Sequence, residues 1–214
     1  MPEGREVPNR RVVLAGKTIC RIAAQAPWAW PLLSRPVMRF FDRASEGWDD
    51  RTRAGSPEHL QALASGLLEV SRVPERVLDL GCGTGAATLF LSREYPRASV
   101  RGLDLSPAMI AKANAKVGLD PEGRVAFRTG DAHSLPYPDD SFDLVTQVNM
   151  PIFFREISRV LRPGGSALIT TSRGDATPFS TPEGLILRKL AGHGFDHVIT
   201  GTAGQGTWVL GTMA

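Results

Sequence analysis

The sequence predicts an α/β protein of three layers, α/β/α, in which helices cover both faces of a doubly wound, mostly parallel, seven-stranded sheet. From residue 76 onward, short apolar runs alternate with helical patterns, and this alternation is typical of βαβ units. Near the end of the chain, two apolar runs flank a glycine-containing turn at residues 203–206. Because tight glycine turns join antiparallel strands, we expect a C-terminal antiparallel hairpin to complete the sheet.

The expected elements follow from the apolar periodicity and from the residues that interrupt it. A helix over residues 57–71 begins after Ser56, a capping residue that precedes a proline and an acid. The sequence Arg-Pro-Gly-Gly at residues 162–165 is expected to end the last helix before the fifth strand. The expected strands are residues 76–80, 99–104, 124–128, 142–147, 166–171, 198–202 and 207–212, and the expected later helices are residues 85–95, 107–117, 151–161 and 182–191.

The N-terminal segment, residues 1–55, has a different pattern from the rest of the chain. Residues 12–53 have helical character but are interrupted by Pro27, Pro31 and Pro36, and they contain three of the four tryptophans. We expect this segment to form a helical lid that packs on a domain of residues 56–214 as one compact unit.

Composition limits the class of protein. The 214 residues are 42% hydrophobic and 22% charged, as in globular domains, and the net charge of +3 is spread along the chain. We therefore expect no nucleic-acid partner. No apolar run approaches the ~20 residues of a membrane span, and the two cysteines form no secretory framework. The expectation is a soluble, cytoplasmic monomer or homodimer without a membrane partner.

A glycine-rich loop directly after the first expected strand is the main candidate binding site. Residues 77–85 read Val-Leu-Asp-Leu-Gly-Cys-Gly-Thr-Gly, and a helix begins immediately afterwards. Glycines allow sharp backbone turns and close approach of a ligand, and the first helix amides attract a negative or polar group. A structural turn is the alternative interpretation of this loop.

Asp104 gives the loop a partner at an informative distance. It ends the second expected strand, 19 residues beyond Gly85, where a carboxylate can accept both hydroxyls of a ribose. Its alternative role is a helix cap, but Ser106 and Pro107 already supply a cap and a first turn. A nucleoside ligand is therefore favoured, and a nicotinamide-dependent oxidoreductase is one enzyme class that fits this pattern.

Residues 78–85 closely resemble the first motif of the class I S-adenosylmethionine-dependent methyltransferases, which have a Rossmann-like fold. The loop reads G-x-G-x-G, whereas the nicotinamide fingerprint reads G-x-G-x-x-G. Segments 102–110, 130–136, 141–145 and 156–165 are similar to later motifs of this family in the same order. Over residues 75–172 the resemblance implies methyl transfer from S-adenosylmethionine to a small-molecule acceptor, with S-adenosylhomocysteine as product.

The resemblance also implies which residues bind this cofactor. The glycine loop and Asp79 would hold its methionine part, Asp104 the ribose, Leu105 and Met109 the adenine faces, and Asp131 and Ala132 the adenine edge. For Leu105 and Met109, an ordinary role in the core is the alternative. The full implied set is Asp79, Gly81, Cys82, Gly83, Gly85, Asp104, Leu105, Met109, Asp131, Ala132, Gln147 and Val148.

The region expected to bind the acceptor departs from the family pattern. Residues 146–154 are several residues shorter than usual, so we expect the N-terminal aromatics to cover the site instead. Phe41-Asp42-Arg43 and Trp48-Asp49 resemble an aromatic-acid motif that many such enzymes place over the cofactor; packing against the sheet is the alternative. The candidate lid and substrate residues are Phe40, Phe41, Trp48, Met150 and Phe153.

The sequence predicts the catalytic residues less clearly than the cofactor-binding residues. Asn149 begins a poor match to the N-P-P-aromatic motif of amino-group methyltransferases, and His133 is a weak candidate base, so the acceptor atom stays open. The cysteine and histidine spacings contain no zinc signature, which predicts that no metal is bound. The alternative function for this fold is a non-catalytic cofactor-binding or partner module.

Overall fold

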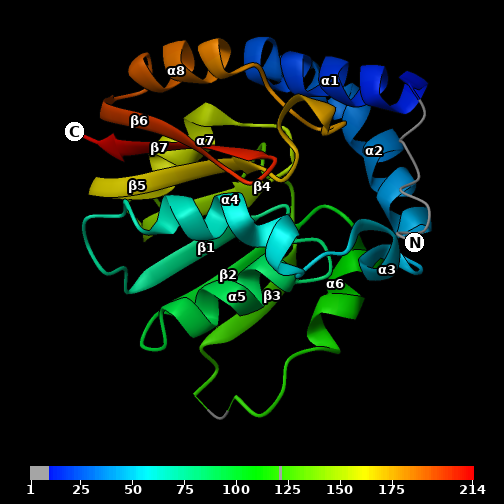
Figure 1. The fold of residues 1–214 in the computed structure, drawn as a ribbon, viewed down its shortest axis with the longest axis horizontal. Coiled ribbons are helices and arrows are strands. Elements are labelled where there is room, and N and C mark those ends of the chain that lie inside the picture. The colour runs from blue at the N-terminus through cyan, green and yellow to red at the C-terminus, as the bar shows by residue number, and fades with distance from the viewer. Residues whose placement is uncertain (1–9, 121) are drawn as a thin grey trace.

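In the computed structural model, which describes residues 10–120 and 122–214, seven strands form one sheet in the order β3-β2-β1-β4-β5-β7-β6 (Figure 1). All neighbouring strands are parallel except β7, which is antiparallel to both β5 and β6. The predicted sheet and its closing hairpin are thus confirmed. The strands are β1 (Arg76–Leu80), β2 (Ser99–Asp104), β3 (Val125–Thr129), β4 (Phe142–Val148), β5 (Leu161–Thr171), β6 (Phe195–Ala203) and β7 (Gly206–Met213).

Helices cover both faces of the sheet, as predicted. On one face lie α4 (Pro57–Leu67) and α5 (Ala86–Glu94), whose apolar side chains share a buried cluster with alternate residues of β1, β4 and β5. On the other face, α7 (Phe154–Val160) and α8 (Glu183–Ala191) pack on the intervening strand residues. A short helix, α6 (Pro107–Asn114), contacts β2 and β3. Strand side chains alternate between faces, so each strand supplies both cores.

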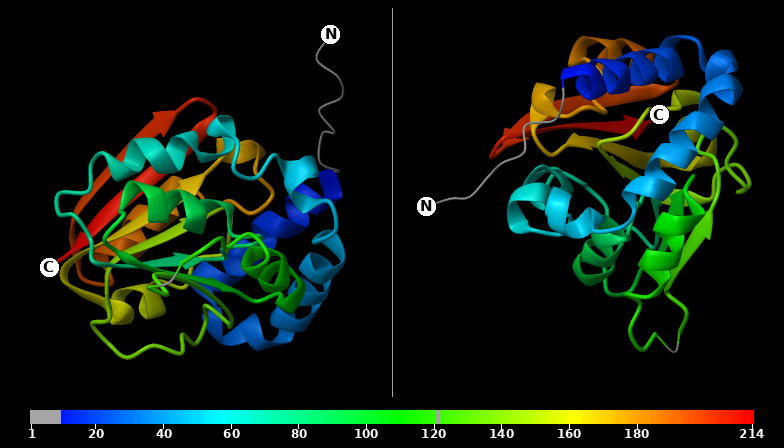
Figure 2. Two further views of the ribbon diagram at one scale, coloured as in Figure 1. Left: turned by 90° about the horizontal axis from the view of Figure 1, so that it is seen from below. Right: turned by 90° about the vertical axis from the view of Figure 1, so that its right-hand side faces the viewer.

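The N-terminal segment is helical and belongs to the same core. It contains α1 (Arg10–Gln25), η1 (Pro27–Ala29), α2 (Trp30–Ala44) and α3 (Trp48–Thr52), while residues 1–9 lie outside the described part. α1 lies on the side of the sheet that carries α8, and α2 passes one end of the strands to reach α6 (Figures 1 and 2). The buried cluster that contains the apolar residues of α7 and α8 also contains four residues of this segment: Ala23, Ala24, Trp30 and Val37.

Several predicted boundaries were wrong for local reasons. Pro36 does not interrupt α2, and Pro31 lies in its first turn, where the missing amide hydrogen is tolerated. The glycines at 164 and 165 do not end a helix before a strand beginning at 166, because β5 already pairs with Phe142 at Leu161 and shifts register across them. The helix predicted over 151–161 is limited to Phe154–Val160, and that predicted over 57–71 ends at Leu67.

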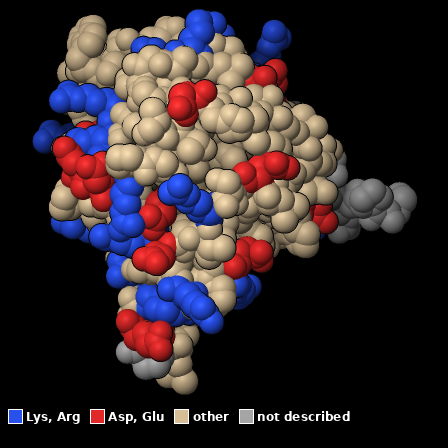
Figure 3. All heavy atoms as spheres, turned by 90° about the vertical axis from the view of Figure 1, so that its left-hand side faces the viewer, with Lys and Arg blue, Asp and Glu red and all other residues tan. Residues whose placement is uncertain are grey.

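Charged groups of both signs are distributed over the surface. On the face shown in Figure 3, lysines and arginines are interspersed with aspartates and glutamates. Within residues 10–120 and 122–214, no helix combines the length and the apolar character needed to cross a membrane.

Candidate functional site

The glycine loop turns at the carboxyl end of β1 and leaves open space beside it. Gly81 and Gly83 have φ angles of 62° and 53°, a conformation that residues with a Cβ adopt only rarely. A Cβ at Gly81 would lie 2.6 Å from the sulfur of Met150, whereas a Cβ at Gly83 would meet no atom within 4 Å. Gly81 thus permits close packing of the β4–α7 connection, and the backbone at Gly83 is open to a ligand.

Asp104 lies beside this loop and retains capacity to accept hydrogen bonds. One carboxylate oxygen accepts from the amide of Gly83 at 2.9 Å, and the other accepts from the amide of Ser106 at 2.8 Å. Burial raises the pKa of Asp104. A carboxylate offers about four acceptor positions, so roughly two remain for the adjacent hydroxyls of a ribose. This fits the nucleoside position that the sequence predicts.

Asp79 is fully buried in β1 beneath the glycine loop. Its two carboxylate oxygens accept from the hydroxyls of Thr88 at 2.6 Å and Thr146 at 3.2 Å. Burial raises the pKa of Asp79 to about 7, while the two hydroxyls partly counteract that rise. A positively charged group in the cavity beside Asp79 would favour the carboxylate form. The ammonium of a methionine moiety is such a group.

The raised pKa predicts two opposite dependences on pH. Between about pH 4 and pH 7 the folded protein holds a proton on Asp79 that the unfolded chain has lost. The free energy of unfolding of the unliganded protein should therefore decrease as pH rises through this window, and Asp79→Asn should remove that contribution. Affinity for S-adenosylhomocysteine should increase over the same window, because its ammonium favours the carboxylate. Denaturant unfolding and calorimetry at pH 5, 6, 7 and 8 measure both; equal pH slopes in the wild type and Asp79→Asn would contradict the prediction.

The position expected for adenine is bounded by β2, α6 and the loop after β3. Met109 and Ala132 are buried, and Leu105 packs partly buried against the core. The carboxylate of Asp131 accepts from the indole Nε1 of Trp30, which lies 2.9 Å from both of its oxygens, and from the amide of His133 at 2.9 Å. Trp30 packs edge-on against Phe153, with 4.9 Å between ring centroids.

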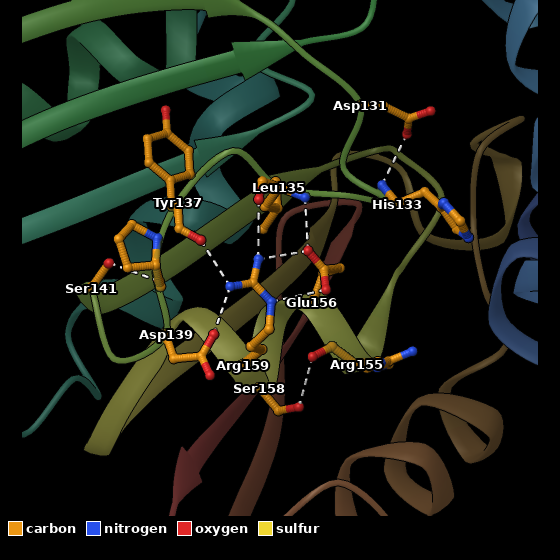
Figure 4. A network of polar contacts seen from close by, with 11 residues as sticks. Asp131, His133, Leu135, Tyr137, Asp139, Ser141, Arg155, Glu156, Ser158 and Arg159 are labelled. Carbon is orange, nitrogen blue, oxygen red and sulfur yellow. Dashed lines mark hydrogen bonds and ion pairs between the residues drawn. The ribbon is translucent and has the colours of Figure 1, made fainter.

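A network of ion pairs and hydrogen bonds around Arg159 holds the loop that carries Asp131 (Figure 4). The guanidinium of Arg159 pairs with Glu156 at 2.7 Å and with Asp139 at 2.8 Å, and it also donates to the carbonyls of Leu135 and Tyr137. Glu156 in turn accepts from the amide of Leu135 at 2.7 Å. Planar guanidinium groups suit such multiple contacts. The network therefore holds residues 131–141 against α7 although they form no regular element.

Polar side chains of the N-terminal segment contact three loops: the glycine loop, the residues after Asp104 and the loop that carries Asp131. Trp30 donates to Asp131, as described above. Asp42 accepts from the Ser106 hydroxyl and from the amide of Ala108, at the start of α6. Asp49 in α3 accepts from the hydroxyl of Thr84 in the glycine loop and pairs with Lys116. These contacts place the segment over the three loops that the sequence assigns to the cofactor.

Below the segment lies a cavity of about 1740 Å³. A pocket for one small ligand measures roughly 300–1,000 Å³, so this cavity has room for a second molecule beside a nucleoside. The predicted lid and substrate residues all line it: Phe40, Phe41, Trp48, Met150 and Phe153. Phe41 is at the centre of an aromatic cluster, with ring centroids 5.7 Å from Trp48 and 5.2 Å from Phe179.

Most of the predicted cofactor residues line the same cavity, but two do not. Gly85 and Gln147 are not part of its wall, and the side-chain oxygen of Gln147 is buried without a hydrogen-bond partner among the described residues. The ten predicted cofactor residues in the wall are Asp79, Gly81, Cys82, Gly83, Asp104, Leu105, Met109, Asp131, Ala132 and Val148.

The two weak catalytic candidates have local roles in the structure. The ring of His133 packs against the ring of Phe153, with 5.6 Å between their centroids, and His133 is not part of the cavity wall. The Asn149 amide donates to the Ser172 hydroxyl at 2.9 Å, and its carbonyl accepts from the Ser172 amide at 2.8 Å. Asn149, which has a φ of 55°, thereby joins the carboxyl ends of β4 and β5.

Sequence reasoning missed several polar residues of the cavity wall, among them Trp30, His59 and Arg173. Trp30 is 101 residues from its partner Asp131, and no motif marks that pair. His59 follows the cap of α4, and Arg173 follows β5, so each looks like an ordinary flanking residue in the sequence.

Across residues 10–120 and 122–214, no group of three or more His, Cys, Asp or Glu side chains is arranged to hold a metal ion. We expect the methyl transfer that the resemblance implies to persist in excess EDTA at its untreated rate, because the cysteine and histidine spacings predict no metal site. The measurement is the initial rate with and without the chelator. Loss of turnover that magnesium restores would contradict this expectation.

Comparison with known proteins supports the resemblance to methyltransferases. Residues 77–165 match the family described as methyltransferase domain. The chain is 38% identical over 144 residues to a malonyl-[acyl-carrier protein] O-methyltransferase of Halorhodospira halophila, covering 64% of this chain and 48% of that protein. It is 37% identical over 106 residues to a fatty-acid O-methyltransferase of Mycolicibacterium smegmatis, covering 46% and 38%. The chain thus spans about half or less of the length of these curated relatives.

A solved structure also resembles the fold. It is phosphoethanolamine N-methyltransferase 2 of Haemonchus contortus in complex with S-adenosyl-L-methionine, with a TM-score of 0.54 and 25% identity. The match covers 66% of this chain and 38% of that one. The family match over residues 77–165, the order of the motifs and the sheet topology agree, and together they support a class I S-adenosylmethionine-dependent methyltransferase.

Proposed function

We propose that the protein binds S-adenosylmethionine and transfers its methyl group to a small molecule with an apolar body. The observation that carries this proposal is a single cavity that joins the glycine loop, Asp104 and Asp131 to the aromatic cluster around Phe41. The cofactor-bound Haemonchus enzyme supports the cofactor, and the fatty-acid O-methyltransferase relative supports a small acceptor with an apolar body.

The residues present fit this cofactor. The open backbone at Gly83 and the buried Asp79 suit the methionine carboxylate and ammonium, and the remaining acceptor positions of Asp104 suit the ribose. Asp131 and the Ala132 amide would bind the adenine edge. When bound, the sulfonium supplies an electrophilic methyl group, so the protein mainly aligns the acceptor and excludes water. Phe41 and Trp48 are well placed to do both.

The direct test combines binding with transfer. Calorimetry should detect one molecule of S-adenosylhomocysteine per chain, and cell extract supplied with methyl-labelled S-adenosylmethionine should yield a labelled small molecule. The product is then identified by mass spectrometry. Binding without any transfer would favour the alternative of a non-catalytic cofactor-binding module.

A nicotinamide-dependent oxidoreductase is the other alternative for a glycine loop with a distal acid. A thermal-shift comparison should show stabilisation by S-adenosylhomocysteine and none by NAD. The reverse result would replace the methyltransferase proposal.

We further propose a cytoplasmic protein that acts as a monomer or homodimer without nucleic acid. Both cysteines are buried and unpaired in the structure, which suits a reducing compartment. The interspersed charges in Figure 3 resemble a solvated surface more than a nucleic-acid footprint. Sedimentation analysis of the purified chain measures the assembly state.

A further inference from the structure

Arg173 is an exposed residue that lines the cavity, and it forms no ion pair with a carboxylate in the described part of the chain. In the same wall, Arg53 is paired with Glu58 at 3.4 Å, and Arg51 donates to the carbonyls of Ala44 and Glu46. Asp50 also lines the cavity and has no ion-pair partner among the described residues. Arg173 is thus a cation that borders the cavity with its charge unpaired.

Contacts through the β4 and β5 ends connect the backbone of Arg173 to the glycine loop. Gly81 packs closely against Met150, and the neighbouring Asn149 makes two hydrogen bonds with Ser172. Arg173 follows Ser172 directly, and its backbone amide donates to the hydroxyl of Thr177 at 3.3 Å. The backbone that carries Arg173 is therefore fixed between the cofactor loop and the turn that leads to Phe179.

The field of Arg173 acts on a second residue of the wall. Burial lowers the pKa of His59, a hydrogen bond to the Thr52 carbonyl opposes this, and the charge of Arg173 lowers the pKa further. His59 is therefore neutral at pH 7 and adds no second positive charge. The same cavity wall contains Phe41, Trp48 and Phe179, which supply an apolar surface.

We propose that Arg173 binds the carboxylate of an apolar carboxylic acid and that this carboxylate is the methyl acceptor. This inference rests on the proposed methyltransferase function. A guanidinium binds carboxylates by paired hydrogen bonds, and the aromatic cluster suits the hydrocarbon part of the acid.

The charges of the reaction fit such an acceptor. A carboxylate oxygen forms a bond to the methyl carbon as the carbon–sulfur bond breaks, and the electron pair of that bond stays on sulfur. The anionic acid becomes a neutral ester and the sulfonium becomes a neutral thioether. No proton is transferred, so the step needs no general base. The ester has lost the charge that Arg173 binds, which favours release of the product.

The test uses the full chain, methyl-labelled S-adenosylmethionine and extract of the cells from which the gene comes. Methyl esters release labelled methanol in mild alkali, whereas methyl groups on nitrogen, carbon or ether oxygen are retained. We expect alkali-labile label, lowered at least 10-fold by Arg173→Gln and partly retained by Arg173→Lys. Ultrafiltration separates a free acid from an acid attached to a carrier protein. The matched control is Arg155→Gln, which changes an exposed arginine outside the cavity wall and should leave transfer unchanged.

A binding measurement supplements the activity assay. In the presence of S-adenosylhomocysteine, dodecanoate should bind at least 10-fold more tightly than dodecanamide, and Arg173→Gln should remove the difference. Alkali-stable label, an unaffected Arg173→Gln variant, or failure of dodecanoate to bind more tightly than the amide would overturn the inference while leaving methyl transfer intact. Absence of S-adenosylhomocysteine binding or of any label transfer would instead overturn the proposed function, and this inference with it.

Discussion

Asp104→Ala is expected to weaken S-adenosylhomocysteine binding by about 100-fold or more. The free carboxylate positions of Asp104 would accept both ribose hydroxyls, and hydrogen bonds to a charged acceptor contribute roughly 1.5–3 kcal/mol each. About 3 kcal/mol corresponds to a factor of more than 100 in the dissociation constant. Isothermal titration calorimetry measures this change. Asp104→Asn should have an intermediate effect because an amide oxygen still accepts one hydroxyl.

A matched control separates ligand contacts from loop support, since Asp104 also accepts from the Gly83 and Ser106 amides. Asp143 accepts from two backbone amides as well, those of Glu75 and Arg76, but it lies outside the cavity wall. Asp143→Ala should lower the melting temperature while leaving affinity within about twofold. If Asp104→Ala binds the product as tightly as the wild type, the assignment of Asp104 to the ribose is wrong.

Phe41→Ala is expected to reduce the rate of methyl transfer by about 100-fold, and Trp48→Ala by about 10-fold, with S-adenosylhomocysteine affinity changed far less. Phe41 contacts Phe40, Trp48 and Phe179, so its loss opens the wall that would align the acceptor. Misplacement of a reacting group by about 1 Å can cost a factor of roughly 100 in rate. Steady-state kinetics with the labelled acceptor, together with calorimetry of the product, measures both effects.

Trp28→Ala is the control for Trp48→Ala. Trp28 is 79% exposed in η1 and does not line the cavity, so its removal changes an aromatic residue of the same segment without changing the wall. Its turnover should equal that of the wild type. Equal losses in the two tryptophan variants would mean that the segment acts through stability alone. Deleting the segment is a poorer experiment, because Ala23 and Trp30 are part of the core and their loss would expose it.

The elements of the predicted binding site for the cofactor could be read from the sequence because local rules govern them. Glycines at 81 and 83 adopt left-handed φ angles that follow from residue type, and Ser56 and Ser106 cap α4 and α6 as their positions predict. Apolar runs of the right length specify central strands such as β1, in which four of five residues are buried. Parallel order then brings the motif loops to one edge of the sheet.

Boundaries that depend on pairing were less predictable. β5 begins five residues earlier than the apolar run at 166, because Leu161 already pairs with Phe142 and the intervening residues form an irregularity in the ladder. Pro36 continues α2 because tertiary packing of Trp30 and Val37 stabilises the helix around it. Propensity is a weak guide where such packing opposes it.

By itself, the sequence determined the resemblance to class I methyltransferases and the loop residues expected to bind a nucleoside cofactor, since each depends on neighbouring residues. Only the tertiary structure decided what faces that site. The pairs Trp30–Asp131, Asp42–Ser106 and Asp49–Thr84 join residues 35 to 101 positions apart. The position of Arg173 in the cavity likewise depends on Asn149, which connects two strand ends. The three pairs arise from the path of the N-terminal segment past one end of the strands, and that path is fixed by burial of apolar side chains in the common core rather than by any local motif.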